Sequence, residues 1–210
     1  LQGTIDTLTM TCVATLLAYV IGIPLGILLV VTGPNGLHPN RILSTVVGWI
    51  VNIGRSVPFI ILLVALIPFT RFVVGTSLGV PGAVVPLVVT AAPFAARMVE
   101  QSLEETDAGL IEAAQSFGAS TWQIVYKVYL KETLPSLVRG AAITFVTLFG
   151  YSAMAGTVGA GGLGDIAIRY GYQRFQTDVM IFAVLLCIVL VIAFQAIGDV
   201  TARKIDKRRR

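Results

Sequence analysis

Residue types that perform covalent chemistry are scarce and scattered in this sequence. The one histidine, His38, lies in a polar turn, so no Ser/His/Asp arrangement is expected. Cys12 and Cys187 stand alone inside apolar runs and form no Cys-x-x-Cys pair. This predicts two buried thiols, with neither a disulfide framework nor a metal site. We therefore expect no catalytic residue and no metal or cofactor site in this chain.

Nucleotide-binding patterns are incomplete. Residues Gly159 to Gly164 read GAGGLG and satisfy G-x-G-x-x-G, but a dinucleotide site also needs a preceding strand and a βαβ unit. Here the pattern follows a predicted membrane helix, so its glycines are predicted to permit a tight re-entrant or external loop. No Gly-Lys-Ser/Thr phosphate-binding loop occurs, so we expect that this chain does not hydrolyse ATP itself.

The elements that position any site are predicted from composition. Apolar residues make up 56% of the 210 residues and charged residues 12%, about half the charged share of a soluble domain. Runs of about twenty apolar residues are typical of membrane spans. The runs in this chain predict one all-α membrane domain, 1–210, lying in a lipid bilayer, with spans at about 7–31, 42–69, 80–99, 137–155 and 179–201.

Lysine and arginine are distributed unevenly between the two ends of these spans. The tail from Arg203 to Arg210 has six basic residues directly after an apolar run, which predicts a cytoplasmic anchor rather than a nucleic-acid site. Apart from Arg55, the other basic residues then fall at the cytoplasmic ends (Arg41, Arg97, Lys127, Lys131 and Arg139) or at the opposite ends (Arg71, Arg169 and Arg174). This bias predicts a cytoplasmic C-terminus and an outer N-terminus.

A polar segment, 107–133, separates the third and fourth predicted spans and would face the cytoplasm. Its pattern predicts two short helices, each with a capping residue at its start and a glycine between them. The capping residues are Thr106 or Asp107 at the first start, Gly118 at the first stop, and Ser120 with Gln123 at the second start. Pro135 then fits the first turn of the next membrane helix.

The two short helices are predicted to be amphipathic. Apolar residues recur at Ile111, Ala114, Trp122, Val125 and Tyr129, three or four apart within each helix, and are predicted to form one apolar face. Such a face can lie on lipid or dock into a groove of a partner protein. The residues alone leave both uses open, although a lipid-bound helix usually has more Lys and Arg.

Within this segment, Glu112-Ala113-Ala114 followed after three residues by Gly118 resembles the EAA loop of ABC importer permeases. Its place between the third and fourth of five helices also fits, although Lys131 stands where the pattern has proline and Leu134-Pro135 follows. Further stretches resemble the methionine-importer branch of these permeases: NIGRSVPFIIL (52–62), GYSAMAG (150–156), GGLGD (161–165) and IRYGYQRF (168–175).

The resemblance implies a type I ABC importer permease in the bacterial cytoplasmic membrane. It implies partners: a second copy of the chain, two ATP-binding subunits that use ATP and Mg²⁺, and an extracytoplasmic methionine-binding protein. It implies that 107–133 is a coupling loop seated on the ATPase, with Glu112 at the rim, Ala113 and Ala114 allowing close approach, and Gly118 making the turn.

Arg55 is the most informative charge, because it falls inside an apolar run. It is either functional at membrane depth or reaches the cytoplasmic interface from a span that begins near Val57. Both interpretations place Arg55 and Ser56 near the cytoplasmic mouth of a path.

Two further groups have a functional and a structural interpretation. Late in the fourth predicted span, Tyr151, Ser152 and Met154 either pack closely through small neighbours or line the path, with Met154 as a gate. The outer segment between the last two spans is either a docking surface for a binding protein or an interfacial belt. Its polar and aromatic residues are Asp165, Arg169, Tyr170, Tyr172, Arg174 and Phe175.

Two other functions remain to be compared with a methionine importer. A channel or secondary transporter would need intramembrane ionisable relays or inverted repeats, and neither is evident in the sequence. An importer of the same architecture for another amino acid or small solute is the other alternative that the sequence leaves open.

Overall fold

The computed structural model describes residues 1–206, which form helices and no strand. The other four residues, 207–210, include four of the six basic residues of the predicted tail and lie outside the described residues. The elements are α1 (Gln2–Thr32), α2 (Arg41–Ser56), α3 (Phe59–Ala65), α4 (Ile67–Val74), α5 (Gly79–Glu104), α6 (Ala108–Ser116), α7 (Thr121–Ile124), η1 (Val125–Tyr129), α8 (Leu130–Glu132), α9 (Leu134–Gly156), α10 (Gly162–Ile166), η2 (Ala167–Tyr172) and α11 (Thr177–Ile205).

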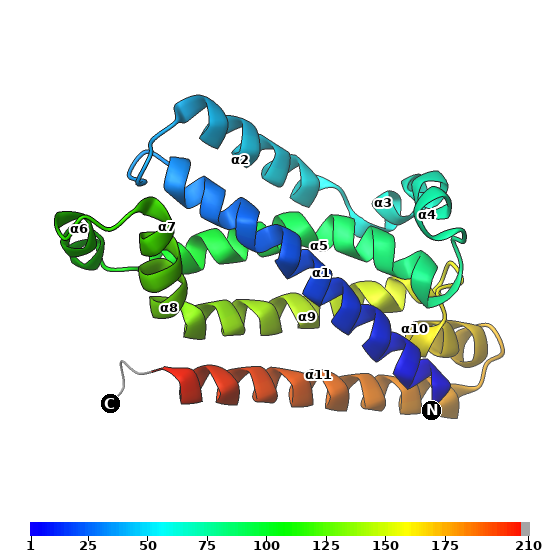
Figure 1. Cartoon of the computed structure of the whole chain (residues 1–210). Helices are drawn as coiled ribbons and strands as arrows, with labels where there is room; N and C mark the ends of the chain where they lie inside the picture. The colour runs from blue at the N-terminus through cyan, green and yellow to red at the C-terminus, as the bar shows by residue number, and fades with distance from the viewer. Residues whose placement is uncertain (207–210) are drawn as a thin grey trace.

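The core of the bundle is built by α1, α5 and α9, and α1 crosses the other two (Figure 1). Small residues let α1 approach α5 closely, as is common in membrane helix pairs. A Cβ atom on Gly22 would lie 2.7 Å from the Cβ of Ala95, and one on Gly26 would lie 2.6 Å from Cγ1 of Val99. Helix α5 is consequently the most enclosed span, with half of its apolar window buried.

Helix α11 forms one edge of the bundle and packs on α9 (Figure 1). Only 6% of its apolar window is buried within the chain. A helix that is hydrophobic on all sides and so exposed needs an apolar surrounding, which a lipid bilayer or another subunit supplies. The composition of α11 therefore agrees with a membrane-embedded chain.

Four helices, α1, α5, α9 and α11, are long and apolar enough to cross a membrane, and the α2–α3 pair is the fifth candidate. The second predicted span, 42–69, is not one continuous helix, because the chain bends by 97° between α2 and α3. Proline disfavours the helical conformation of the residue before it. Val57, which precedes Pro58, is accordingly extended, with φ −83° and ψ 125°.

The two ends of the bundle differ in structure (Figure 1). Elements α6, α7 and α8 lie at the same end as the last turns of α11. The N-terminus of α1 lies at the other end with α10, as expected for an odd number of spans. Here the Thr7 hydroxyl accepts a hydrogen bond of 2.9 Å from the Leu163 N–H, which fastens α10 to α1.

Candidate functional site

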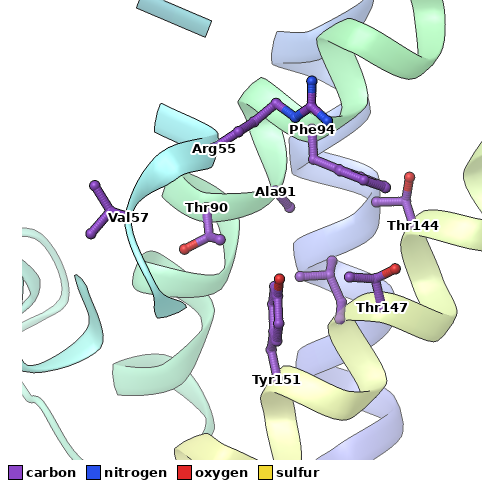
Figure 2. Close-up of a pocket in the computed structure, with 9 residues that line it drawn as sticks. Arg55, Val57, Thr90, Ala91, Phe94, Thr144, Thr147 and Tyr151 are labelled. Carbon is purple, nitrogen blue, oxygen red and sulfur yellow. The ribbon is translucent and has the colours of Figure 1, made fainter. Parts of the chain in front are cut away.

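A pocket of about 140 Å³ lies between the C-terminal end of α2, the middle of α5 and the second half of α9 (Figure 2). Residues three or four apart share one face of a helix, and the lining residues of α5 and α9 follow that spacing. The pocket is lined by Arg55 and Val57, by Thr90, Ala91 and Phe94 of α5, and by Thr144, Thr147, Leu148 and Tyr151 of α9.

Arg55 supplies the charge of this pocket. It lies in the last turn of α2, and its Cζ atom is 5.9 Å from the ring centroid of Phe94, a cation–π contact. None of the ion pairs formed within residues 1–206 includes Arg55. Helix α2 ends directly after Arg55-Ser56, at Val57, so Arg55 lies next to the bend between α2 and α3.

Tyr151 faces Arg55 across the pocket (Figure 2). Its ring stacks on Phe59, with centroids 4.8 Å apart and an interplanar angle of 5°. Phe59 is buried in the first turn of α3, so the bend at Pro58 places the residue that orients Tyr151. Aromatic pairs in such contact contribute about 0.5–1.5 kcal/mol beyond the area that they bury.

Three threonines complete the pocket walls, and the sequence analysis did not find them. Their hydroxyls donate to backbone carbonyls of their own helices: Thr90 to Pro86 (2.9 Å), Thr144 to Gly140 (2.8 Å) and Thr147 to Ile143 (3.0 Å). A signal was available for Thr144 and Thr147 of α9, because two small polar residues three positions apart on one face are unusual in an apolar span, whereas Thr90 has no such neighbour on α5.

The other residues predicted to line a path do not contribute to this pocket. The Ser56 hydroxyl donates to the Asn52 carbonyl at 2.7 Å and is exposed. Ser152 is buried and donates to the Phe149 carbonyl at 2.7 Å. The Met154 side chain is 47% exposed on the bundle surface. Of the five residues predicted for the path, the structure brings only Arg55 and Tyr151 together in the pocket.

Polar contacts fasten α2 to α5 beside the pocket. Arg97 donates to the Asn52 side chain at 3.0 Å and to Glu100 at 2.5 Å. Two residues further along α2, a Cβ atom on Gly54 would lie 2.6 Å from Cγ of Pro93. This close approach fixes the distance between Arg55 and the α5 wall of the pocket.

The polar segment 107–133 forms the predicted pair of short helices. The Asp107 carboxylate accepts from the Gly109 N–H at 2.7 Å and caps α6, and Ser120 with Gln123 forms the capping box of α7. Gly118 has φ +75°. The following N–H of Ala119 donates back to the Ala114 carbonyl at 3.0 Å, the pattern in which a left-handed residue ends a helix.

Most of the predicted apolar face of this helical hairpin packs in one cluster with Val99 and Leu103 of α5, and of its five residues only Trp122 lies outside that cluster; the four inside it are Ile111, Ala114, Val125 and Tyr129. Val125 and Tyr129 are buried against the C-terminal part of α5, and burial raises the pKa of the Tyr129 hydroxyl above its ordinary value. Trp122 instead is 79% exposed, and so is Phe117 at 91%. Glu112 and Ala113 are also exposed, and Ala114 is half-buried.

The first loop contributes to holding the hairpin in place. The His38 imidazole lies 2.6 Å from the hydroxyl of Thr121, a hydrogen bond between chain segments far apart in sequence. The only histidine is therefore a structural contact. No cluster of three metal-binding side chains occurs in residues 1–206.

At the opposite end, the glycine-rich pattern forms a turn into the short helix α10. Gly159, Gly161 and Gly162 have φ of +91°, +76° and +83°, and no strand precedes them among the described residues. A Cβ atom on Gly164 would lie 2.3 Å from the carbonyl oxygen of Ala153. The chain therefore turns back against α9, as a re-entrant loop does.

The predicted docking residues gather at this same end. Asp165 and Arg169 form an ion pair on successive turns. The Cζ atoms of Arg169 and Arg174 lie 5.3 Å and 4.6 Å from the ring centroid of Tyr170. Tyr172 and Phe175 are exposed. These contacts order one polar and aromatic surface beside α10.

These features define a class of protein. The chain is a bundle of apolar helices with a pocket among its spans and an exposed helical hairpin at one end. This architecture suits a membrane component that a solute crosses.

Comparison with known proteins identifies the family. A family model described as "Binding-protein-dependent transport system inner membrane component" matches residues 22–210. The chain belongs to this family, which confirms the resemblance to importer permeases that the EAA-like segment indicated.

Individual relatives agree over most of their length. The chain is 50% identical to a probable D-methionine transport system permease protein of Vibrio cholerae, covering 99% of this chain and 92% of that protein. It is 56% identical to the D-methionine transport system permease protein of Escherichia coli K12, covering 74% of this chain and 71% of that protein. The methionine import system permease protein of Bacillus subtilis is 45% identical, with coverage of 86% and 82%.

Solved structures share the fold. A chain of the MetNI methionine ABC transporter in an inward-facing conformation has a TM-score of 0.96 and 52% identity, with coverage of 98% of this chain and 95% of that one. A chain of an amino acid ABC transporter has a TM-score of 0.78 at 18% identity, with coverage of 97% and 92%, which shows similarity of fold alone.

Proposed function

We propose that this chain is the permease subunit of an ATP-driven methionine importer, with 1–210 forming one transmembrane domain. The observation that carries this proposal is the similarity to relatives that are named as methionine permeases, at 45% to 56% identity over 74% to 99% of this chain. The similarity to a methionine ABC transporter chain at a TM-score of 0.96 supports it.

The hairpin of α6 and α7 serves as the coupling element toward a separate ATPase subunit that binds ATP and Mg²⁺. Its caps make it rigid, and its exposed tip presents Phe117 and Trp122 as well as Glu112 and Ala113. Large exposed aromatic side chains at one protruding tip are typical of an interface with a partner protein. Gly118 makes the turn that holds the two helices at their angle.

Two copies of the chain form the complete path, each with its hairpin on one ATPase subunit. The pocket lined by α2, α5 and α9 has a volume of only about 140 Å³, whereas a solute path needs walls along its whole length. The orientation follows the basic residues: the hairpin and the C-terminal end of α11 face the cytoplasm, and the N-terminus faces outward. The surface around Asp165 and Tyr170 then receives an extracytoplasmic methionine-binding protein.

Transport proceeds by alternating access. ATP binding closes the ATPase pair, which moves the two hairpins and the spans attached to them, so that the path opens outward. Hydrolysis reverses the change and releases the solute inward. ATP drives the cycle because it binds the two conformations with different affinity.

The test is uptake of labelled methionine into proteoliposomes that contain the permease, the ATPase and the binding protein. We expect uptake that requires ATP and is competed by methionine-like compounds alone. ATP-dependent uptake of another amino acid would support an ATP-driven importer but contradict methionine as its substrate. Uptake by the chain alone, without ATPase or ATP, would replace the importer with a secondary transporter.

A further inference from the structure

The pocket between α2, α5 and α9 has the chemistry of a ligand site. We propose that it binds the transported amino acid within the membrane domain, with the carboxylate at Arg55 and an apolar side chain between Phe94 and Tyr151. This inference rests on the proposed importer function and adds a selective site inside the permease. The substrate class is a zwitterionic amino acid with an uncharged, apolar side chain.

Arg55 carries a positive charge that forms no ion pair within residues 1–206, although it lies near enough to Glu100 for the two charges to attract each other. No acidic side chain lines the pocket. Its planar guanidinium matches a carboxylate in shape and offers several N–H donors. The Phe94 ring occupies one side of it and leaves those donors for a ligand.

The remaining walls favour an apolar side chain. Phe94, Leu148 and Tyr151 supply carbon surface, and thioether sulfur makes favourable contacts with aromatic rings. The hydroxyl hydrogens of Thr90, Thr144 and Thr147 are engaged by carbonyls of their own helices. These threonines therefore cannot donate to a ligand, but their oxygens keep lone pairs that can accept from an α-ammonium group.

The size of the pocket limits the ligand to a single small molecule. Its volume of about 140 Å³ is close to that of cavities that hold benzene. This volume admits a methionine-sized side chain and excludes a peptide. A cationic side chain would be repelled by the Arg55 charge, so lysine and arginine are predicted to bind more weakly than methionine.

The experiment measures binding of radiolabelled methionine to the purified permease–ATPase complex in lipid nanodiscs, without binding protein. Equilibrium dialysis compares the wild type with Arg55→Gln and with Thr147→Met, which places a long side chain on the pocket wall. The matched control is Arg41→Gln, the same change on an exposed residue at the start of the same helix. Unlabelled methionine and methioninamide, which lacks the carboxylate, serve as competitors.

We expect saturable methionine binding by the wild type and by Arg41→Gln. Arg55→Gln should weaken it about tenfold or more, the effect of losing a hydrogen bond to a charged group. Thr147→Met should abolish it, and methioninamide should compete at least about tenfold more weakly than methionine.

Several results would overturn the proposal. They are absence of binding by the wild-type complex, equal binding by Arg55→Gln and Arg41→Gln, and equal competition by methioninamide. Uptake with the binding protein present separates the two proposals. If ATP drives methionine uptake but dialysis detects no methionine binding to the permease–ATPase complex, the pocket proposal is rejected and the importer proposal stands. Uptake of another amino acid in place of methionine rejects the methionine assignment. Dialysis with that amino acid then tests whether the pocket binds the transported solute.

Discussion

The turn at Gly118 offers a direct test of whether the hairpin couples the permease to its ATPase. The backbone there is left-handed, with φ +75°, and a Cβ atom would meet no atom within 4 Å. Gly118→Ala therefore adds no steric clash, and its whole cost is the left-handed conformation, about 1–2 kcal/mol for an L-residue. Since each 1.4 kcal/mol is about tenfold in an equilibrium constant, the turn should open about five- to thirtyfold more often.

The assay is ATP-driven methionine uptake in proteoliposomes, with co-purification of the ATPase subunit measured in parallel. We expect Gly118→Ala to lower both, Gly118→Val to lower them further, and Gly118→Asn to retain most activity, because asparagine tolerates the left-handed region best among side-chain-bearing residues. The matched control is Gly150→Ala in α9, where the backbone is helical and a Cβ atom also meets nothing within 4 Å.

Comparison of uptake and assembly among these variants tests whether the left-handed turn matters for coupling. If alanine, valine and asparagine at position 118 all leave uptake and assembly at the wild-type level, the turn does not matter for coupling. If the control Gly150→Ala is as impaired as Gly118→Ala, the loss comes from the added methyl group rather than from backbone conformation.

Three further substitutions test contacts outside the pocket. Gly164→Ala places Cβ 2.3 Å from the carbonyl oxygen of Ala153, so it should destabilise the bundle by about 1–3 kcal/mol and lower the melting temperature of the detergent-solubilised protein; an unchanged temperature would contradict the tight turn. Thr7→Val removes the acceptor of the Leu163 N–H and should cost about 1–3 kcal/mol in the same assay, whereas Thr7→Ser should be milder. Ser120→Ala removes one half of the capping box and should destabilise the hairpin by about 1 kcal/mol, seen as faster amide hydrogen exchange in 121–124; equal exchange would show that the cap adds nothing.

Features that depend on neighbours in sequence could be predicted well. The caps at Asp107 and Ser120 and the stop at Gly118 each involve contacts within a few residues, so the local pattern contained the information. The long apolar runs predicted α1, α5, α9 and α11, although each helix extends several residues beyond its apolar run. Polar residues in the terminal turns are helical but do not add to the hydropathy of the run, which is why the predicted spans are shorter than the helices.

Features that depend on the direction of a side chain could not be predicted in the same way. Tyr151 and Ser152 are adjacent in sequence, yet Tyr151 lines the pocket and Ser152 is buried against its own helix. Trp122 fits the helical spacing of Val125 and Tyr129 and is nevertheless exposed. Periodicity identifies residues that share a face, but the packing of other elements decides how much of that face is covered.

The sequence by itself determined that this chain is a helical membrane component with a capped hairpin, because apolar length, capping residues and left-handed glycine positions act locally. Only the tertiary structure decided where a ligand could bind. Arg55, Thr90 and Tyr151 are far apart along the chain, and the bend at Pro58 and the close contact of Gly54 with Pro93 bring them around one pocket. A site built from three helices exists only once those helices have packed.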